Sequence, residues 1–113
     1  MKEEEHKLQI ACVNWFRYQF PRYLIFSVPN GGQRNAIVAA KLKAEGAMAG
    51  VADLVIVASN KVLFIEMKTK KGYQSDKQIE FERKVKRLGF EYFVCHSLDE
   101  FIKAVKGCLY MDK

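Results

Sequence analysis

The sequence predicts an α/β fold in which helices flank a mixed central β-sheet. A β-hairpin is indicated by two apolar, β-branched runs at 54–58 and 62–65, which flank turn residues at 59–61. A helix at about 75–88 and a short strand at 92–95 are expected after the hairpin. This connection is long enough for a right-handed parallel crossover, so antiparallel and parallel pairing should occur in one sheet.

The elements before the hairpin follow from periodicity and from helix-breaking residues. Residues 4–20 predict a helix because apolar side chains recur every three or four positions and acids occupy the first turn. Pro21 ends this helix, and β-branched and aromatic residues at 23–28 predict the next strand. The Pro-Asn-Gly-Gly turn at 29–32 leads into a second helix at about 34–45, and a flexible approach to the hairpin is expected after it.

Two serines mark the starts of the helices that follow the hairpin. Ser75 precedes the first of them, and Gln78 three residues later completes a capping box. Gln78 also lies one turn before Phe81 on the apolar stripe, so its side chain either caps the helix or faces a site. Ser97 caps a final amphipathic helix that continues through Val105.

Length, charge and cysteine content narrow the class of protein. A chain of 113 residues predicts one domain, and a net charge of +6 with a pI near 9.3 favours a polyanionic partner, although a basic domain needs none. Cys12, Cys95 and Cys108 are odd in number and lie in apolar contexts, which indicates reduced thiols of an intracellular protein. Without a signal region or an apolar run of about 20 residues, we expect a cytoplasmic protein with no membrane partner.

Two acids and a lysine should meet at one end of the predicted hairpin. Asp53 opens its first strand and Glu66 closes its second, and antiparallel pairing brings these two positions to the same end of the sheet. Lys68 lies two residues beyond Glu66 and therefore on the same face. Singly, such residues are more often turn formers or solvated side chains. Together they predict an oxygen-rich site of the kind that Mg²⁺ or Mn²⁺ prefers.

Further charged residues are candidates for the surroundings of this site. Lys70 and Lys71 follow directly in a basic loop, which is either a solvated turn or a neighbour of the acids. Arg34 opposes the dipole of the second helix, and a phosphate contact would explain its placement. Extending the apolar stripe of the first helix backwards reaches both Glu4 and Glu5, so periodicity leaves open which of them points inward.

Five short blocks occur in a fixed order along the chain. They read Glu5-x-x-x-Gln9, Pro29-Asn30-Gly31-Gly32-x-Arg34, Gly50-x-x-Asp53-Leu54, Glu66-x-Lys68 and Gln78. Together they resemble the VRR-NUC branch of the PD-(D/E)XK nuclease superfamily, including its small stand-alone members from viruses and bacteria. The resemblance covers about 4–106 and implies a restriction-endonuclease-like core, an antiparallel meander plus a parallel strand. One departure is Ala52, where this branch often has proline, which could loosen the approach to the metal.

The resemblance implies an active site that binds Mg²⁺ or Mn²⁺ and cleaves phosphodiester bonds. Its implied metal ligands are Asp53, Glu66, the backbone carbonyl of Met67, and Glu5 directly or through water. Lys68 would orient or activate the attacking water, and Gln78 would position that water or contact the scissile phosphate. Asn30 and Arg34 would be secondary site or DNA-contact residues. With the basic residues near the site, the candidate nucleic-acid contacts are Asn30, Arg34, Lys70, Lys71 and Lys77.

The implied activity is that of a structure-specific DNA endonuclease acting on branched DNA, such as Holliday-junction-like or flap substrates. A single site per chain would require a homodimer for symmetric cutting of two strands. The implied setting is a bacterial cell, with the protein encoded either by the cell or by a virus. Two alternatives remain open on the sequence: a non-catalytic nucleic-acid-binding module with the same fold, and an RNA-processing nuclease with the same site.

Overall fold

The computed structural model describes residues 3–29 and 35–110, and its elements follow the predicted order. They are α1 (Glu3–Gln19), β1 (Leu24–Ser27), α2 (Ala36–Ala44), β2 (Leu54–Ala58), β3 (Lys61–Met67), α3 (Asp76–Arg87), β4 (Glu91–Cys95) and α4 (Leu98–Leu109). Asn35, Ser75 and Ser97 cap the helices α2, α3 and α4, each accepting a backbone N–H with its side chain. The helices and strands that the hydrophobic periodicity of the sequence predicts are therefore all present, in the predicted order.

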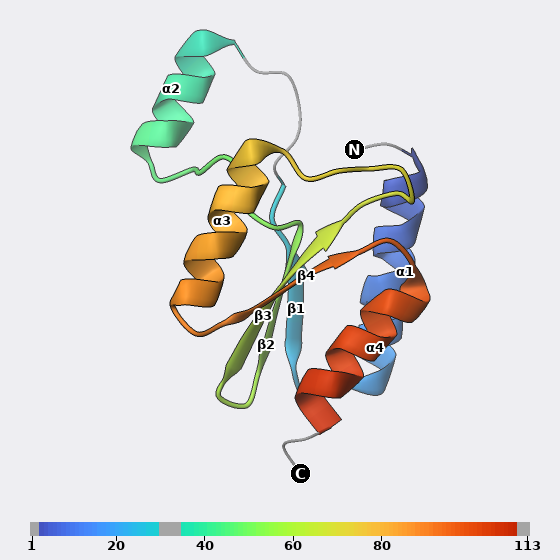
Figure 1. Cartoon of the computed structure of the whole chain (residues 1–113). Helices are drawn as coiled ribbons and strands as arrows, with labels where there is room; N and C mark the ends of the chain where they lie inside the picture. Colours follow the sequence, from blue (N-terminus) through green and yellow to red (C-terminus); the bar gives the residue numbers. More distant parts are fainter. Residues whose placement is uncertain (1–2, 30–34, 111–113) are drawn as a thin grey trace.

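The sheet is mixed and has the strand order β1-β2-β3-β4 (Figure 1). β1 pairs antiparallel with β2, and β2 pairs antiparallel with β3. β4 lies parallel to β3, because α3 carries the chain back across the sheet before β4 begins (Figure 1). The predicted α/β class, with its meander, parallel crossover strand and flanking helices, is confirmed.

The hairpin between β2 and β3 is tighter than predicted. Ala58 pairs with Lys61, so the turn contains only Ser59 and Asn60, and Lys61 belongs to β3. Asn60 adopts a φ of 56°, a left-handed conformation that asparagine tolerates better than most residues. The amine of Lys61 also donates a hydrogen bond of 2.7 Å to the carbonyl of Cys108, which ties this end of the sheet to α4.

Two clusters of apolar side chains cover the two faces of the sheet. The larger one packs α1 and α4 on one face, and its buried members include Cys12, Phe16, Leu54, Ile56, Leu63, Ile65, Phe101 and Val105. The smaller one packs α3 on the opposite face and contains Ala52, Val85 and Tyr92, with Phe64, Phe81 and Val94 partly buried against them (Figure 1). α2 stands apart from both layers, and none of its residues is buried (Figure 1).

The cysteines lie in or beside the core, as their apolar contexts predict. Cys12 and Cys95 are buried, and Cys108 is half-buried. Burial raises the pKa of both buried thiols to about 12, so they remain protonated and unreactive at physiological pH. In the part of the chain that the structure describes, no helix is long and apolar enough to cross a membrane.

The segment before β2 makes a close contact instead of the flexible approach that the sequence suggests. Gly50 has a φ of +85°, and a Cβ added there would lie 2.3 Å from the carbonyl oxygen of Lys77 and 2.9 Å from the backbone nitrogen of Gln78. Only glycine combines this backbone conformation with so close an approach. The contact fixes the segment that leads to Asp53 against the first turn of α3.

Gly50→Ala should therefore destabilise the protein more than Gly89→Ala, which provides a matched control. Gly89 also has a positive φ, 92°, but nothing lies within 4 Å of an added Cβ there. Both variants carry the left-handed strain, whereas only Gly50→Ala adds a collision with backbone atoms, which should cost about 1–3 kcal/mol more. Urea unfolding curves would measure the difference, and equal midpoints for the two variants would contradict the close contact.

Candidate active site

The register of the hairpin brings Asp53 and Glu66 to one end of the sheet. Leu54 pairs with Ile65, so the residues immediately outside this pair, Asp53 and Glu66, are neighbours across the two strands. The carbonyl of Asp53 accepts a 2.8 Å hydrogen bond from the backbone N–H of Val28, which anchors Asp53 to the end of β1. Asp53 and Glu66 therefore lie side by side at the same end of the sheet, as the sequence predicts.

The Asp53 carboxylate is directed at the end of β3. Its Oδ2 accepts a 2.8 Å hydrogen bond from the backbone N–H of Met67, the last residue of that strand. This bond adds one more hydrogen bond at the end of the β2–β3 pair, with a side-chain carboxylate as the acceptor instead of a backbone carbonyl. Ala52 supports this arrangement from behind, because it is fully buried in the cluster with Val85 and Tyr92. The alanine that departs from the family pattern thus packs tightly.

Glu66 is a buried acid whose two carboxylate oxygens have different surroundings. Its relative exposure is 2%, and Oε2 accepts a 2.7 Å hydrogen bond from the side-chain amide of Gln78. The Lys68 amine forms an ion pair with the same oxygen at 3.6 Å. The other oxygen, Oε1, is buried without a hydrogen-bond partner in the structure. Such an orphaned acceptor costs free energy and is rare in proteins.

The electrostatic environment of Glu66 opposes its ionisation. Burial is the main cause and the nearby charge of Asp53 adds to it, and together they raise the pKa of Glu66 to about 8, although Lys68 acts in the opposite direction. A cation beside the two acids would offset both effects, because it favours the ionised form of each. The site therefore lacks positive charge relative to its acids.

Gln78 fulfils both roles that the sequence left as alternatives. It completes the capping box, since Ser75 Oγ accepts its backbone N–H at 3.2 Å and its Oε1 accepts the backbone N–H of Ser75 at 2.8 Å. Its Nε2 meanwhile donates to Glu66. Capping uses the amide oxygen and site contact uses the amide nitrogen, so the two roles do not compete.

The first helix contributes less to the acidic pair than the family pattern implies. Glu4 is exposed and Glu5 is half-buried, which selects Glu5 as the acid that points inward. Over residues 3–29 and 35–110, however, no group of three or more His, Cys, Asp or Glu side chains is placed to hold a metal ion. The structure therefore does not bring Glu5 together with Asp53 and Glu66 as a third carboxylate ligand.

The remaining predicted residues lie around the site or outside the described part of the chain. Lys70 and Lys71 are exposed and line a surface hollow that contains two acids of α1, Glu3 and Glu4. Lys77 is exposed on α3 and forms an ion pair of 3.7 Å with Glu80. Asn30 and Arg34 lie outside the described residues.

Three residues near the site were not among the candidates chosen from the sequence. The side-chain amide of Gln74 donates to Glu82 Oε1 at 2.9 Å and to the hydroxyl of Tyr92 at 3.3 Å. Burial, followed by the charge of Glu66, raises the pKa of the Tyr92 hydroxyl. These residues come from the loop after β3, from α3 and from β4. No local pattern in the sequence marks this contact, because it forms only when α3 and β4 have packed against each other.

The donor set fits a hard divalent cation. Asp53 lies directly before β2, one residue outside the strand that the sequence predicts it to open, and beside Glu66 of β3. Glu66 has a buried oxygen without a partner, and the backbone at Met67 lies beside both acids. Mg²⁺ commonly binds one or two protein carboxylates and keeps several waters, so a third acid is not required.

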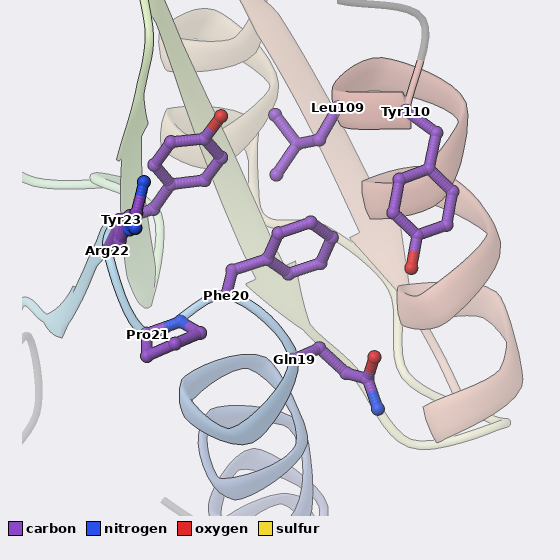
Figure 2. Close-up of a pocket in the computed structure, with 7 residues that line it drawn as sticks. All are labelled: Gln19, Phe20, Pro21, Arg22, Tyr23, Leu109 and Tyr110. Atoms are coloured by element: carbon purple, nitrogen blue, oxygen red, sulfur yellow. The ribbon is translucent and has the colours of Figure 1, made fainter. Parts of the chain in front are cut away.

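A separate hollow between the ends of α1 and α4, lined by aromatic residues such as Phe20 and Tyr110, lies toward the start of β1 (Figure 2). It is remote from the acids.

The pH dependence of stability should reveal the cost of ionising Glu66. Its pKa is raised in the folded protein to about 8 from 4.5, so the folded state binds more protons than the unfolded state between these values. The free energy of unfolding must then fall as pH rises through this window. In chelator, the stability of Glu66→Gln relative to the wild type should increase by about 4 kcal/mol between pH 5 and pH 8.5. Urea unfolding at both pH values is the measurement, and a pH-independent difference would contradict it.

Comparison with known proteins agrees with this geometry. The family model of the VRR-NUC domain matches residues 3–99. A solved structure described as a VRR_NUC domain protein is similar with a TM-score of 0.77 and 22% identity, over 97% of this chain and 91% of that chain. A second, described as a VRR_NUC domain, has a TM-score of 0.70 and 16% identity, over 95% and 99%. No curated protein matches the sequence.

Identities this low show a shared fold, whereas the family match spans most of the sequence. The matched range contains the paired strands, both acids, Lys68 and Gln78. The chain therefore belongs to the VRR-NUC family, whose domain has a nuclease-type, nucleic-acid-processing fold.

Proposed function

We propose that this protein is a divalent-metal-dependent DNA endonuclease. The observation that carries the proposal is the buried Glu66 carboxylate, whose Oε2 is held by Gln78 and Lys68 while Oε1 has no partner. Together with Asp53, which directly precedes the neighbouring strand β2, this oxygen offers a position for a cation at the end of the two central strands. The family supports nucleic acid as the substrate, and the net charge of +6 suits a polyanion.

Each residue of the site has a distinct role in this proposal. Asp53, Glu66 and the carbonyl of Met67 hold Mg²⁺ or Mn²⁺, and Glu5 reaches the cation through water. A bound cation of this kind supplies acidified water and Lewis-acid stabilisation of the phosphate. Lys68 places a positive charge where the reacting phosphate gains negative charge, and it orients the attacking water. Gln78 fixes the orientation of the Glu66 carboxylate and contacts the water or the phosphate.

Basic residues near the site would hold the nucleic acid. Lys70, Lys71 and Lys77 are exposed, and Asn30 and Arg34 complete the proposed contacts. We expect the substrate to be branched DNA, such as a flap or a four-way junction, cut by a homodimer. A symmetric pair of sites suits the cutting of two strands, and two-fold symmetry is the commonest arrangement of two identical chains.

Cleavage assays test the chemistry directly. Wild type should cleave labelled flap or four-way-junction DNA in Mg²⁺ or Mn²⁺ but not in EDTA, whereas Asp53→Asn and Lys68→Ala should lose at least a hundredfold in rate. Lys106→Ala removes the same charge at the far end of α4 and should retain the wild-type rate. Cleavage that persists in EDTA, or equal rates for wild type and Asp53→Asn, would overturn the mechanism.

The same assay separates the two alternative functions. A non-catalytic module would bind these substrates in a salt-sensitive manner without cutting them in either metal. An RNA-processing nuclease would cut RNA of the same secondary structure faster than DNA, with the same loss of rate in Asp53→Asn. Size-exclusion chromatography with light scattering, with and without a four-way junction, would measure the number of chains in the complex.

Metal binding can be measured without a substrate. Mg²⁺ or Mn²⁺ should raise the melting temperature of the wild type, because a ligand that binds only the folded state stabilises it in proportion to the logarithm of its concentration. At a hundredfold excess over the dissociation constant, the expected stabilisation is about 2.7 kcal/mol. Asp53→Asn and Glu66→Gln should lose most of the shift. A similar shift in all three proteins, or in NaCl of equal ionic strength, would contradict a specific site.

A further inference from the structure

The amide group of Gln78 can work in the site only in one orientation. Its nitrogen must face Glu66 to donate to Oε2, as it does at 2.7 Å. The flipped amide would present its oxygen to Glu66, where it would repel the ionised carboxylate. A second contact that accepts only the amide oxygen would fix which end of the amide faces the acid.

The backbone N–H of Ser75 supplies that constraint. It is a donor and cannot accept, and it lies 2.8 Å from Gln78 Oε1. Because the oxygen is held there, the nitrogen of the same planar amide points to Glu66. The hydroxyl of Ser75 adds a second link by accepting the Gln78 backbone N–H at 3.2 Å. One N-terminal residue of α3 thus holds both the backbone and the side chain of Gln78.

The segment that carries Ser75 is itself held in place. Its neighbour Gln74 donates to Glu82 at 2.9 Å and to Tyr92 at 3.3 Å, so the loop is joined to α3 and β4. On the other side, Gly50 allows the chain before Asp53 to approach the backbone of Gln78. The start of α3 is therefore fixed from two directions, by side-chain hydrogen bonds and by close backbone packing.

We propose that Ser75 is a positioning residue, which orients the Gln78 amide through its backbone N–H and so sets the hydrogen bonding of Glu66. The inference rests on the proposed function only in its consequence for catalysis. The hydrogen-bond chain from Ser75 through Gln78 to Glu66 can be measured separately, without substrate and in the presence of chelator.

Three variants separate positioning from general helix stability. Ser75→Pro deletes the N–H, and the φ of Ser75, −74°, suits a proline ring. Ser75→Ala keeps the N–H and removes only the hydroxyl. Ser97→Ala is the matched control, because Ser97 caps α4 with a similar hydrogen bond of 3.1 Å to the backbone N–H of Glu100. Loss of either serine hydroxyl should destabilise the protein by a similar amount.

The first readout is the NMR signal of the Gln78 side-chain amide in chelator. The shifts of its two protons should differ from random-coil values in the wild type and in Ser97→Ala, and they should approach random-coil values in Ser75→Pro. If Ser75→Pro does not fold, the proposal is tested by comparing the hydrogen-exchange rate of the Ser75 backbone amide in the wild type and in Gln78→Ala. Exchange should be at least tenfold faster in Gln78→Ala. An unchanged Gln78 signal in Ser75→Pro, or unchanged exchange in Gln78→Ala, would overturn the proposal whether or not the protein is a nuclease.

The second readout is the single-turnover cleavage rate at saturating DNA. The rate should fall at least tenfold in Ser75→Pro, less in Ser75→Ala, and not at all in Ser97→Ala. In a Gln78→Ala background, Ser75→Pro should cause no further loss, because residues that act through one another are not additive. Additive losses would contradict positioning through Gln78, even with cleavage by the wild type intact. Failure of the wild type to cleave would refute the proposed function and leave the NMR result to decide this inference.

Discussion

The architecture of the candidate site depends on one constraint, the burial of the Glu66 carboxyl group at the end of β3. A buried acid is tolerated when hydrogen bonds and opposite charge compensate for lost hydration, and here Gln78 and Lys68 do so at one oxygen only. The second oxygen has no partner, and the charge of Asp53 makes ionisation harder still. The remaining elements hold these groups in a geometry that their mutual repulsion opposes.

The fold supplies the required rigidity through the ends of β2 and β3 and through the hydrogen bonds that hold Asp53 just before β2. Asp53 and Glu66 are held by ladder positions next to the pair Leu54 and Ile65, so neither acid can move without disturbing the sheet. The crossover helix α3 then brings Gln78 over the same edge, and its capping box fixes the side chain. The end of strand β3 and the N-terminus of helix α3 thereby meet where Gln78 contacts Glu66, although these two residues are 12 positions apart in the sequence.

Stability and function are in tension at this edge. The apolar packing of α1, α3 and α4 on the sheet stabilises the protein, whereas the acidic pair consumes part of that stabilisation. Unfavourable burial of this kind is characteristic of functional sites, where a ligand restores the balance. Gly50 shows a related compromise, because glycine loses more conformational entropy on folding than other residues but permits the contact between the segment before Asp53 and the start of α3.

The sequence by itself determined the order of elements, the mixed sheet, the capping box and the meeting of Asp53, Glu66 and Lys68. Each of these follows from local periodicity or from strand register, which depend on residues close in the chain. Only the tertiary structure decided that Gln78 both caps α3 and binds Glu66, and that Gly50 is a tight contact. These outcomes depend on how helices pack on the sheet, a set of long-range contacts that no local pattern encodes.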